Sequence, residues 1–149
     1  MTEILFYHLE RGRVEDVLPG LLEKTLARGW RAMVQTSDTA RVEQLDSFLW
    51  IYRDDSFLPH GGGSDGTGQP IWITDNNETN GADVLFLVDG AQVDTEAAAG
   101  FERCVLIFDG RNDDALSNAR GFWKEGNGAG FDATYWKQSA QGRWEKQNV

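Results

Sequence analysis

Short apolar runs alternate with longer amphipathic stretches along this 149-residue chain, and this alternation restricts the possible fold more than any other feature. The runs have apolar residues at consecutive positions, as strands buried on both faces of a sheet do. Between them, apolar residues recur at helical spacing. The expected strands are 4–8, 30–36, 70–74, 84–88 and 103–108, and the expected helices are 14–28, 38–50, a short alanine-rich 96–99, and one from 113 to about 126–130. The order predicts a single α/β domain with three α/β/α layers around a Rossmann-like, mainly parallel sheet.

Local signals mark several boundaries of these elements. Gly29 follows the first expected helix, where a residue that tolerates positive φ is typical. Ser37 or Asp38 is suited to cap the second helix. The run 135–138 reads as a terminal edge strand, and residues 61–68, which contain five glycines, read as a flexible surface loop.

The charge of the chain argues against unaided nucleic-acid binding. The net charge is −10, whereas binding to phosphates depends on Lys and Arg. Residues 1–110 carry 8 basic and 19 acidic side chains, but residues 111–149 carry 6 basic and 5 acidic ones. An acidic ligand would therefore meet the C-terminal quarter of the chain. No apolar run approaches the length of a membrane span, and the single cysteine, Cys104, fits a cytoplasmic protein.

Catalytic and cofactor motifs are weak. The glycine-rich loop lacks the Gly-Lys-Ser/Thr ending of a phosphate loop and precedes a strand instead of following one. His8 and His60 are the only histidines, and neither has metal-ligand spacing with another His or Cys. We therefore expect no metal and no cofactor. The alternative is a small α/β enzyme, a hydrolase or nucleotidyl enzyme, that uses Asp109 and Asp113 after the fifth strand, although the sequence shows no base to accompany them.

The segment 119–124 combines cations with an aromatic ring. On a helix, Arg120, Trp123 and Lys124 lie together at positions i, i+3 and i+4. Such a face suits a ligand that is apolar at one end and carries a carboxylate. In the alternative interpretation, Leu116, Ala119 and Trp123 form a buried stripe and the two cations are only solvated.

A second unusual segment is the apolar junction 50–61. It places bulky apolar residues between an acidic helix and the glycine-rich loop, where a polar loop is usual. These residues either fold back on the core or form a docking surface for another protein. The residues concerned are Trp50, Phe57, Leu58 and Pro59, with His60 at the rim.

The order of these motifs resembles the chi subunit of bacterial DNA polymerase III holoenzyme. The resemblance rests on Trp50 followed by 57–61, the strand 70–73, the Arg120-x-x-Trp123-Lys124 face, and the aromatic residues of 130–136. It covers nearly the whole chain, with an expanded glycine loop at 61–68 and a C-terminal extension at 139–149. The family implies a non-catalytic adaptor that links the clamp loader, usually through the psi subunit, to the tail of single-stranded-DNA-binding protein. That tail is acidic and ends in hydrophobic residues and a free carboxylate.

The resemblance also implies roles for individual residues. Arg120, Trp123 and Lys124 match the family residues that hold the tail, and Leu116 lies on the same helix. Trp50 and the segment 57–60 match the side used towards psi, or towards another clamp-loader component. Contact with nucleic acid would be indirect. A third reading, direct binding of single strands, would use Trp136, Arg143, Trp144 and Lys146.

Overall fold

The computed structural model describes residues 2–10, 12–51, 60–62, 71–75, 82–93, 95–139 and 143–147, with the side chains of 48–51 and 60–62 left out. The strands are β1 (Glu3–Leu9), β2 (Ala32–Gln35), β3 (His60–Gly62), β4 (Ile71–Thr74), β5 (Val84–Leu87), β6 (Arg103–Asp109), β7 (Asp132–Gln138) and β8 (Trp144–Gln147). The helices are α1 (Val14–Ala27), α2 (Thr39–Ile51), α3 (Thr95–Ala98) and α4 (Asp113–Gly128).

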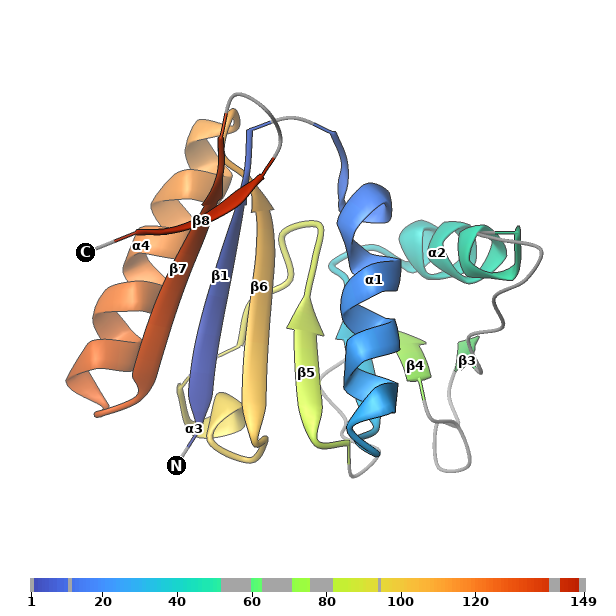
Figure 1. The fold of residues 1–149 in the computed structure, drawn as a ribbon, viewed down its shortest axis with the longest axis horizontal. Helices are drawn as coiled ribbons and strands as arrows, with labels where there is room; N and C mark the ends of the chain where they lie inside the picture. The colour runs from blue at the N-terminus through green and yellow to red at the C-terminus, as the bar shows by residue number, and fades with distance from the viewer. Residues whose placement is uncertain are drawn as a thin grey trace.

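All eight of these strands form one sheet, in the order β3-β4-β2-β5-β6-β1-β7-β8 (Figure 1). Strands β1 to β7 are parallel, and only β8 runs antiparallel to its neighbour. β1 is inserted between β6 and β7, so the N-terminal strand pairs with two strands from the last third of the chain. The mainly parallel sheet expected from the sequence is confirmed.

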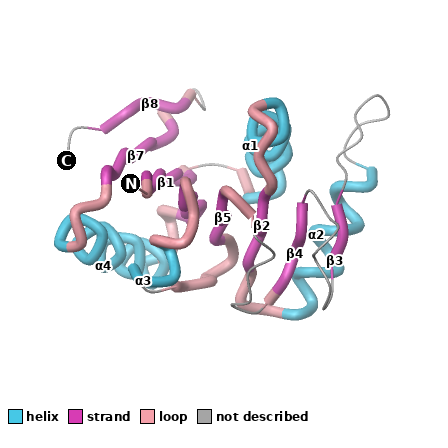
Figure 2. Tube along the Cα trace, turned by 90° about the horizontal axis from the view of Figure 1, so that it is seen from below, coloured by secondary structure: helices cyan, strands magenta, loops and turns pink. Residues whose placement is uncertain are grey.

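Two hydrophobic cores lie on opposite faces of this sheet. In β2, Ala32 and Val34 face one core and Met33 faces the other, which explains why the strand is apolar at consecutive positions. α1 and α2 cover the first face, and α3 and α4 cover the second; Figure 2 shows α1 on the opposite side of the sheet from α3 and α4. The three-layer prediction is therefore confirmed.

Local chemistry sets the helix ends as expected. Gly29 has a φ of +79° just after α1, a conformation that costs a glycine nothing. The Asp38 side chain accepts a hydrogen bond from the Ala40 backbone N–H at 2.9 Å at the start of α2. Asn112 caps α4, where its side chain accepts a hydrogen bond from the Ala115 N–H at 3.0 Å.

Cys104 is fully buried, and this burial raises its pKa to about 12, so it is a core residue rather than a nucleophile.

The C-terminal end of the sheet differs from the sequence-based expectation. The prediction that 135–138 is a terminal edge strand is wrong, because β8 from the C-terminal extension pairs with β7 and takes the edge. Trp144 of β8 packs edge-on against Tyr7 of β1, with ring centroids 5.0 Å apart. At the other edge, Gly61 and Gly62 belong to β3, and the rest of the expected glycine loop lies outside the described residues.

Candidate functional site

Helix α4 presents a mixed surface that follows directly from its periodicity. Ala119 and Phe122 are buried against the sheet, whereas Arg120 and Lys124 are exposed. Leu116 and Trp123 lie between these two sets and are half-buried. The two interpretations of this helix are therefore combined: the apolar residues pack against the core, and part of Trp123 still reaches the surface beside the cations.

The four residues predicted from this helix line one groove. Leu116, Arg120, Trp123 and Lys124 form one wall of a hollow of about 550 Å³. The opposite wall and floor come from β1, β7, β8 and the turn after β6, through His8, Glu10, Gly110, Tyr135, Lys137 and Gln147. The tertiary structure thus brings the helical face against polar groups from both ends of the chain.

Trp123 is held in place by other aromatic rings. Its ring lies 5.3 Å from that of Phe6 and 6.1 Å from that of Tyr135, between centroids. The Tyr135 ring in turn stacks on Phe6 at 5.8 Å with an interplanar angle of 16°. Aromatic pairs in such geometries add about 0.5–1.5 kcal/mol each beyond their burial. The indole is therefore a fixed apolar surface, which loses little conformational entropy when a ligand packs on it.

The charges that line the groove are mainly positive. Arg120, Lys124 and Lys137 stand against one carboxylate, Glu10. Lys137 Nζ lies 3.4 Å from Glu10 Oε1, while Arg120 and Lys124 form no ion pair with any residue in the described part of the chain. Two cations are thus available to an anionic ligand on a protein that is otherwise acidic.

Sequence reasoning missed the residues of the groove that come from the strands. His8 and Lys137 are register partners of the parallel β1–β7 pair, and Phe6 is the partner of Tyr135. The signal for Tyr135 and Lys137 is the period-two alternation of β7, which places both on the side of α4. That signal becomes useful only once β7 is known to lie beside β1.

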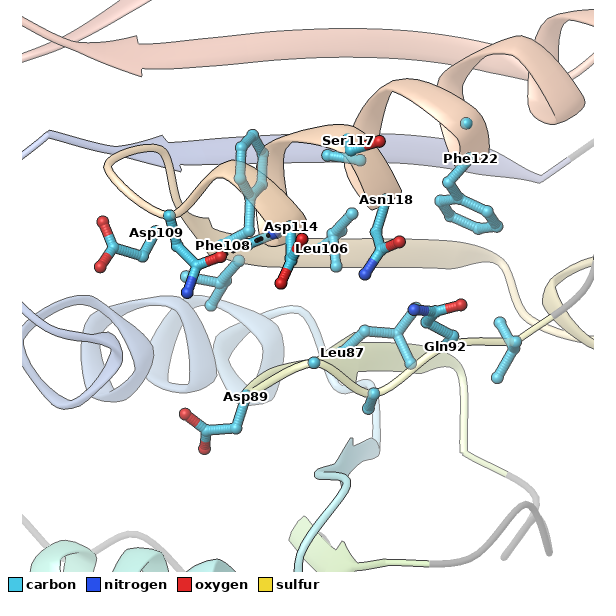
Figure 3. A pocket seen from close by; sticks show the side chains of 18 of the residues that line it. Leu87, Asp89, Gln92, Leu106, Phe108, Asp109, Asp114, Ser117, Asn118 and Phe122 are labelled. Atoms are coloured by element: carbon cyan, nitrogen blue, oxygen red, sulfur yellow. Dashed lines mark hydrogen bonds between the residues drawn. The ribbon is translucent and has the colours of Figure 1, made fainter.

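The carboxylates of the enzyme alternative lie near a second cavity of about 540 Å³, between the loop after β5 and α4. Asp109 is at its margin, and Asp113 does not line it. Figure 3 shows the Asp109 carboxylate pointing away from the space between Asn118 and Gln92. Asp109 accepts hydrogen bonds from Arg111 Nε at 2.8 Å and from the Arg111 backbone N–H at 3.0 Å, and the side-chain bond holds its pKa below the ordinary value.

Asp113 has a structural role that needs no catalysis. It lies with Asp114 in the first turn of α4, where the helix dipole favours negative charge. Asp109 and Asp113 therefore form no acid–base pair in this structure. Among the described residues, no group of three or more His, Cys, Asp or Glu side chains could hold a metal ion.

The apolar junction 50–61 connects α2 to β3, the strand at the opposite edge of the sheet from the groove. Trp50 belongs to the last turn of α2, and His60 begins β3 beside Ile71 of β4. Phe57, Leu58 and Pro59 lie outside the described residues, as do the side chains of Trp50 and His60. The structure therefore places only the backbone of Trp50 and His60, and the docking surface stays a prediction.

Of the residues suggested for direct nucleic-acid binding, Trp136 and Lys146 are register partners of β7 and β8, and Trp144 lies two residues from Lys146, so these three are on the face of the sheet opposite the groove. Trp144 packs on Tyr7 and against the α1 side of the sheet. Arg143 and Lys146 are exposed, Arg143 just before the edge strand β8 and Lys146 within it.

Within the described ranges, no helix is both long enough and apolar enough to cross a membrane.

Comparison with known proteins agrees with this architecture. The family model described as "DNA polymerase III chi subunit, HolC" matches residues 1–134. A protein of Rickettsia prowazekii (strain Madrid E), named "Probable DNA polymerase III subunit chi", is 28% identical over 117 residues, which cover 73% of this chain and 71% of the relative. Tyr135, Lys137 and Gln147 of the groove lie beyond the end of the family match. The chain therefore belongs to the DNA polymerase III chi subunit family, whose members are non-catalytic accessory subunits of the replication machinery, and it is not an enzyme by itself.

Proposed function

We propose that this protein, a cytoplasmic adaptor, connects the polymerase III clamp loader to single-stranded-DNA-binding protein by holding the acidic C-terminal tail of that protein in the groove of α4. The observation that carries the proposal is the convergence of Leu116, Arg120, Trp123 and Lys124 on one hollow. These residues come from one helix face, and the strand residues opposite them close the groove.

The groove and such a tail are chemically complementary. The tail is acidic and ends in apolar residues and a free carboxylate, as the resemblance to the family implies. Arg120 and Lys124 can donate charge-assisted hydrogen bonds to carboxylates, and Leu116 and Trp123 offer apolar contact about one helical turn away. The rest of the protein carries most of the negative charge and would repel an acidic tail, so charge also selects this face.

The second partner is proposed to dock on the other side of the molecule. Trp50, Phe57, Leu58, Pro59 and His60 are the residues that we assign to a psi subunit or another clamp-loader component. The junction that carries them leads into β3, whereas the groove lies near β7 and β8, so the two partners would occupy opposite ends of one sheet. This arrangement suits a linking protein because neither partner blocks the other.

Calorimetry with a tail peptide tests the first assignment. Loss of a charge-assisted contact costs about 1.5–3 kcal/mol, so Arg120→Ala or Lys124→Ala is expected to weaken binding about tenfold or more. Added salt should weaken binding of the unaltered protein as well, because the two cations are exposed. Lys146→Ala is the matched control, since Lys146 is an exposed cation that does not line the groove.

Full-length and tail-truncated single-stranded-DNA-binding protein separate the remaining possibilities. The proposal expects capture of the full-length protein and loss of capture when the tail is removed. If the Arg120→Ala/Lys124→Ala double variant binds the tail peptide with the same affinity as the unaltered protein, the assignment of the tail to this groove is refuted. Tight binding of single-stranded DNA alone, reduced by Lys146→Ala, would instead favour direct contact through β8.

A further inference from the structure

Three polar side chains form a row along the floor of the groove, joined by a hydrogen bond between His8 and Tyr135 and by a close His8–Glu10 contact that lacks hydrogen-bond geometry. Glu10 Oε1 lies 2.9 Å from His8 Nε2, and His8 Nδ1 lies 2.6 Å from the Tyr135 hydroxyl oxygen. All three residues line the groove, and His8 is only 6% exposed. Because Tyr135 also touches the Trp123 ring, the row ends directly below the surface that we assign to the ligand.

The His8 imidazole has no freedom to turn. Its ring packs against that of Phe108 at 5.1 Å, between centroids. Gly110 lies beside the Nε2 edge of the ring, where an added Cβ would be 1.8 Å from His8 Nε2. The missing side chain at position 110 therefore provides the space that the ring occupies. The orientation that points Nδ1 at Tyr135 and Nε2 at Glu10 is set by packing.

The order of donors in this row follows from the chemistry of its members. A carboxylate has no hydrogen to donate, so Glu10 Oε1 at 2.9 Å favours the tautomer that carries its hydrogen on His8 Nε2, although the contact lacks hydrogen-bond geometry. In a neutral imidazole Nδ1 is then an acceptor, and the Tyr135 hydroxyl must donate to it. The lone pairs of the Tyr135 oxygen are left facing the groove, which disfavours a carboxylate at that point.

Protonation of His8 reverses this order. With hydrogens on both nitrogens, Nδ1 donates to the Tyr135 oxygen, and the phenol hydrogen becomes free to turn into the groove. A ligand carboxylate can accept that hydrogen, and it also lies near the imidazolium charge. The same two residues thus repel a carboxylate when His8 is neutral and bind it when His8 is protonated.

The surroundings of His8 keep it neutral in the free protein at neutral pH. Burial lowers its pKa below the ordinary value, Glu10 beside it acts in the opposite direction, and Lys137 and Arg120 add to the lowering. The other charged or titratable groups near the ring are Asp109, at the end of β6, and Tyr135, whose own pKa is raised by burial. A bound carboxylate would add a negative charge to this set and favour the protonated ring.

We infer that Tyr135 and His8 form a proton-coupled part of the binding site, in which an anionic peptide end accepts a hydrogen bond from Tyr135 while His8 takes up a proton. The inference rests on the proposed function, because it assumes that the groove receives a carboxylate. No covalent bond changes, and the proton comes from the solvent. Tyr135 lies one residue beyond the part of the chain that matches the family model.

The sign of the pH dependence follows from linkage. The pKa of His8 is lowered in the free protein and rises when the ligand is bound, so binding takes up a proton between the two values. Affinity is therefore higher at low pH and falls as the pH rises through the pKa of the complex. Peptide carboxylates titrate near pH 4, so a window from about pH 6 to pH 8 isolates the histidine.

Calorimetry in two buffers with different ionisation enthalpies measures the proton count directly. The probe is a synthetic acidic peptide that ends in apolar residues and a free carboxylate. We expect uptake of up to about one proton per complex and an affinity that falls by roughly threefold to tenfold between pH 6 and pH 8. Tyr135→Phe keeps the ring but removes the hydroxyl, and His8→Gln keeps hydrogen-bonding capacity but cannot charge. Both variants should bind more weakly at pH 6 and lose most of the pH dependence.

The control is His60→Gln, which leaves His8 as the only histidine of the chain and should keep the full proton uptake. Peptide binding without proton uptake, or unchanged pH dependence in Tyr135→Phe, overturns the inference and leaves the proposed function standing. Failure of the peptide to bind at any pH overturns both. Nitrogen-15 NMR of the free protein is an independent check, since an Nδ1–H tautomer of His8 at pH 7.5 would contradict the row of donors.

Discussion

At the scale of single residues, the shape of the groove floor depends on an absent side chain. Gly110 sits against the His8 imidazole so closely that any Cβ there would overlap the ring. By contrast, a Cβ at Gly121, on the exposed side of α4, would have nothing within 4 Å. Two glycines eleven positions apart therefore have opposite roles, one required by packing and one merely tolerated.

Gly110→Ala and Gly121→Ala should change stability in opposite directions. The first forces a buried ring to move, and overpacking of this kind costs about 1–3 kcal/mol. The second removes a flexible residue from a helix interior and should stabilise by about 0.5–1 kcal/mol. Urea denaturation of both variants gives the two values. A Gly110→Ala protein as stable as the unaltered one would mean that the His8 ring is not confined as described.

At the scale of elements, a partly buried arginine connects segments that are distant in sequence. Arg41 of α2 donates from Nη2 to Glu15 of α1 at 2.8 Å and from Nε to Asp89, after β5, at 2.9 Å. Burial acts to raise the pKa of Glu15, but the hydrogen bond with Arg41, a backbone hydrogen bond and the charges of Arg41 and Arg13 together outweigh this effect, and the pKa is lowered. The network holds both helices of one layer against the loop that leads into the other layer.

Arg41→Ala should destabilise the fold by about 1–3 kcal/mol, because it leaves two partly buried carboxylates without their shared cation. Arg13→Ala is the matched control: Arg13 is 69% exposed and lies 3.8 Å from the same Glu15, so its loss should cost less than about 0.5 kcal/mol. Since the pKa of Glu15 is lowered by folding, the difference between the variants should shrink as the pH falls below about 4.5. Thermal denaturation at pH 7 and pH 3.5 measures both effects, and equal losses from the two variants would refute the network.

At the scale of the whole molecule, the C-terminal extension completes the sheet. β8 covers the edge of β7, packs Trp144 on Tyr7, and contributes Gln147 to the groove. β8 itself then forms the edge of the sheet, where an edge strand offers unpaired backbone groups to other chains. One short segment thus contributes both to the stability of the sheet and to the binding site.

Truncation after Gln138 should therefore destabilise the protein by about 2–4 kcal/mol, through the loss of one strand pairing and of the Trp144 contact. For a chain of this length that corresponds to a fall in Tm of roughly 4–16 °C. A control truncation that removes only residues 148–149, which follow β8, should leave the Tm unchanged. Calorimetric scans combined with light scattering measure stability and association together, and an unchanged Tm of the longer truncation would show that β8 contributes nothing.

The sequence alone determined the nature and sequential order of most elements, because periodicity, caps and glycines act over a few residues. It also indicated the Arg120, Trp123 and Lys124 face, since these side chains meet within one helix. β3 and β8 were missed because they lack the apolar runs that marked the other short strands: β3 reads His-Gly-Gly and β8 reads Trp-Glu-Lys-Gln. Only the tertiary structure decided that β1 lies between β6 and β7, because strands that are apolar on both faces carry no signal for their neighbours. That pairing brings His8 and Tyr135 together across 127 positions of sequence, and so the floor of the groove exists only in the folded chain.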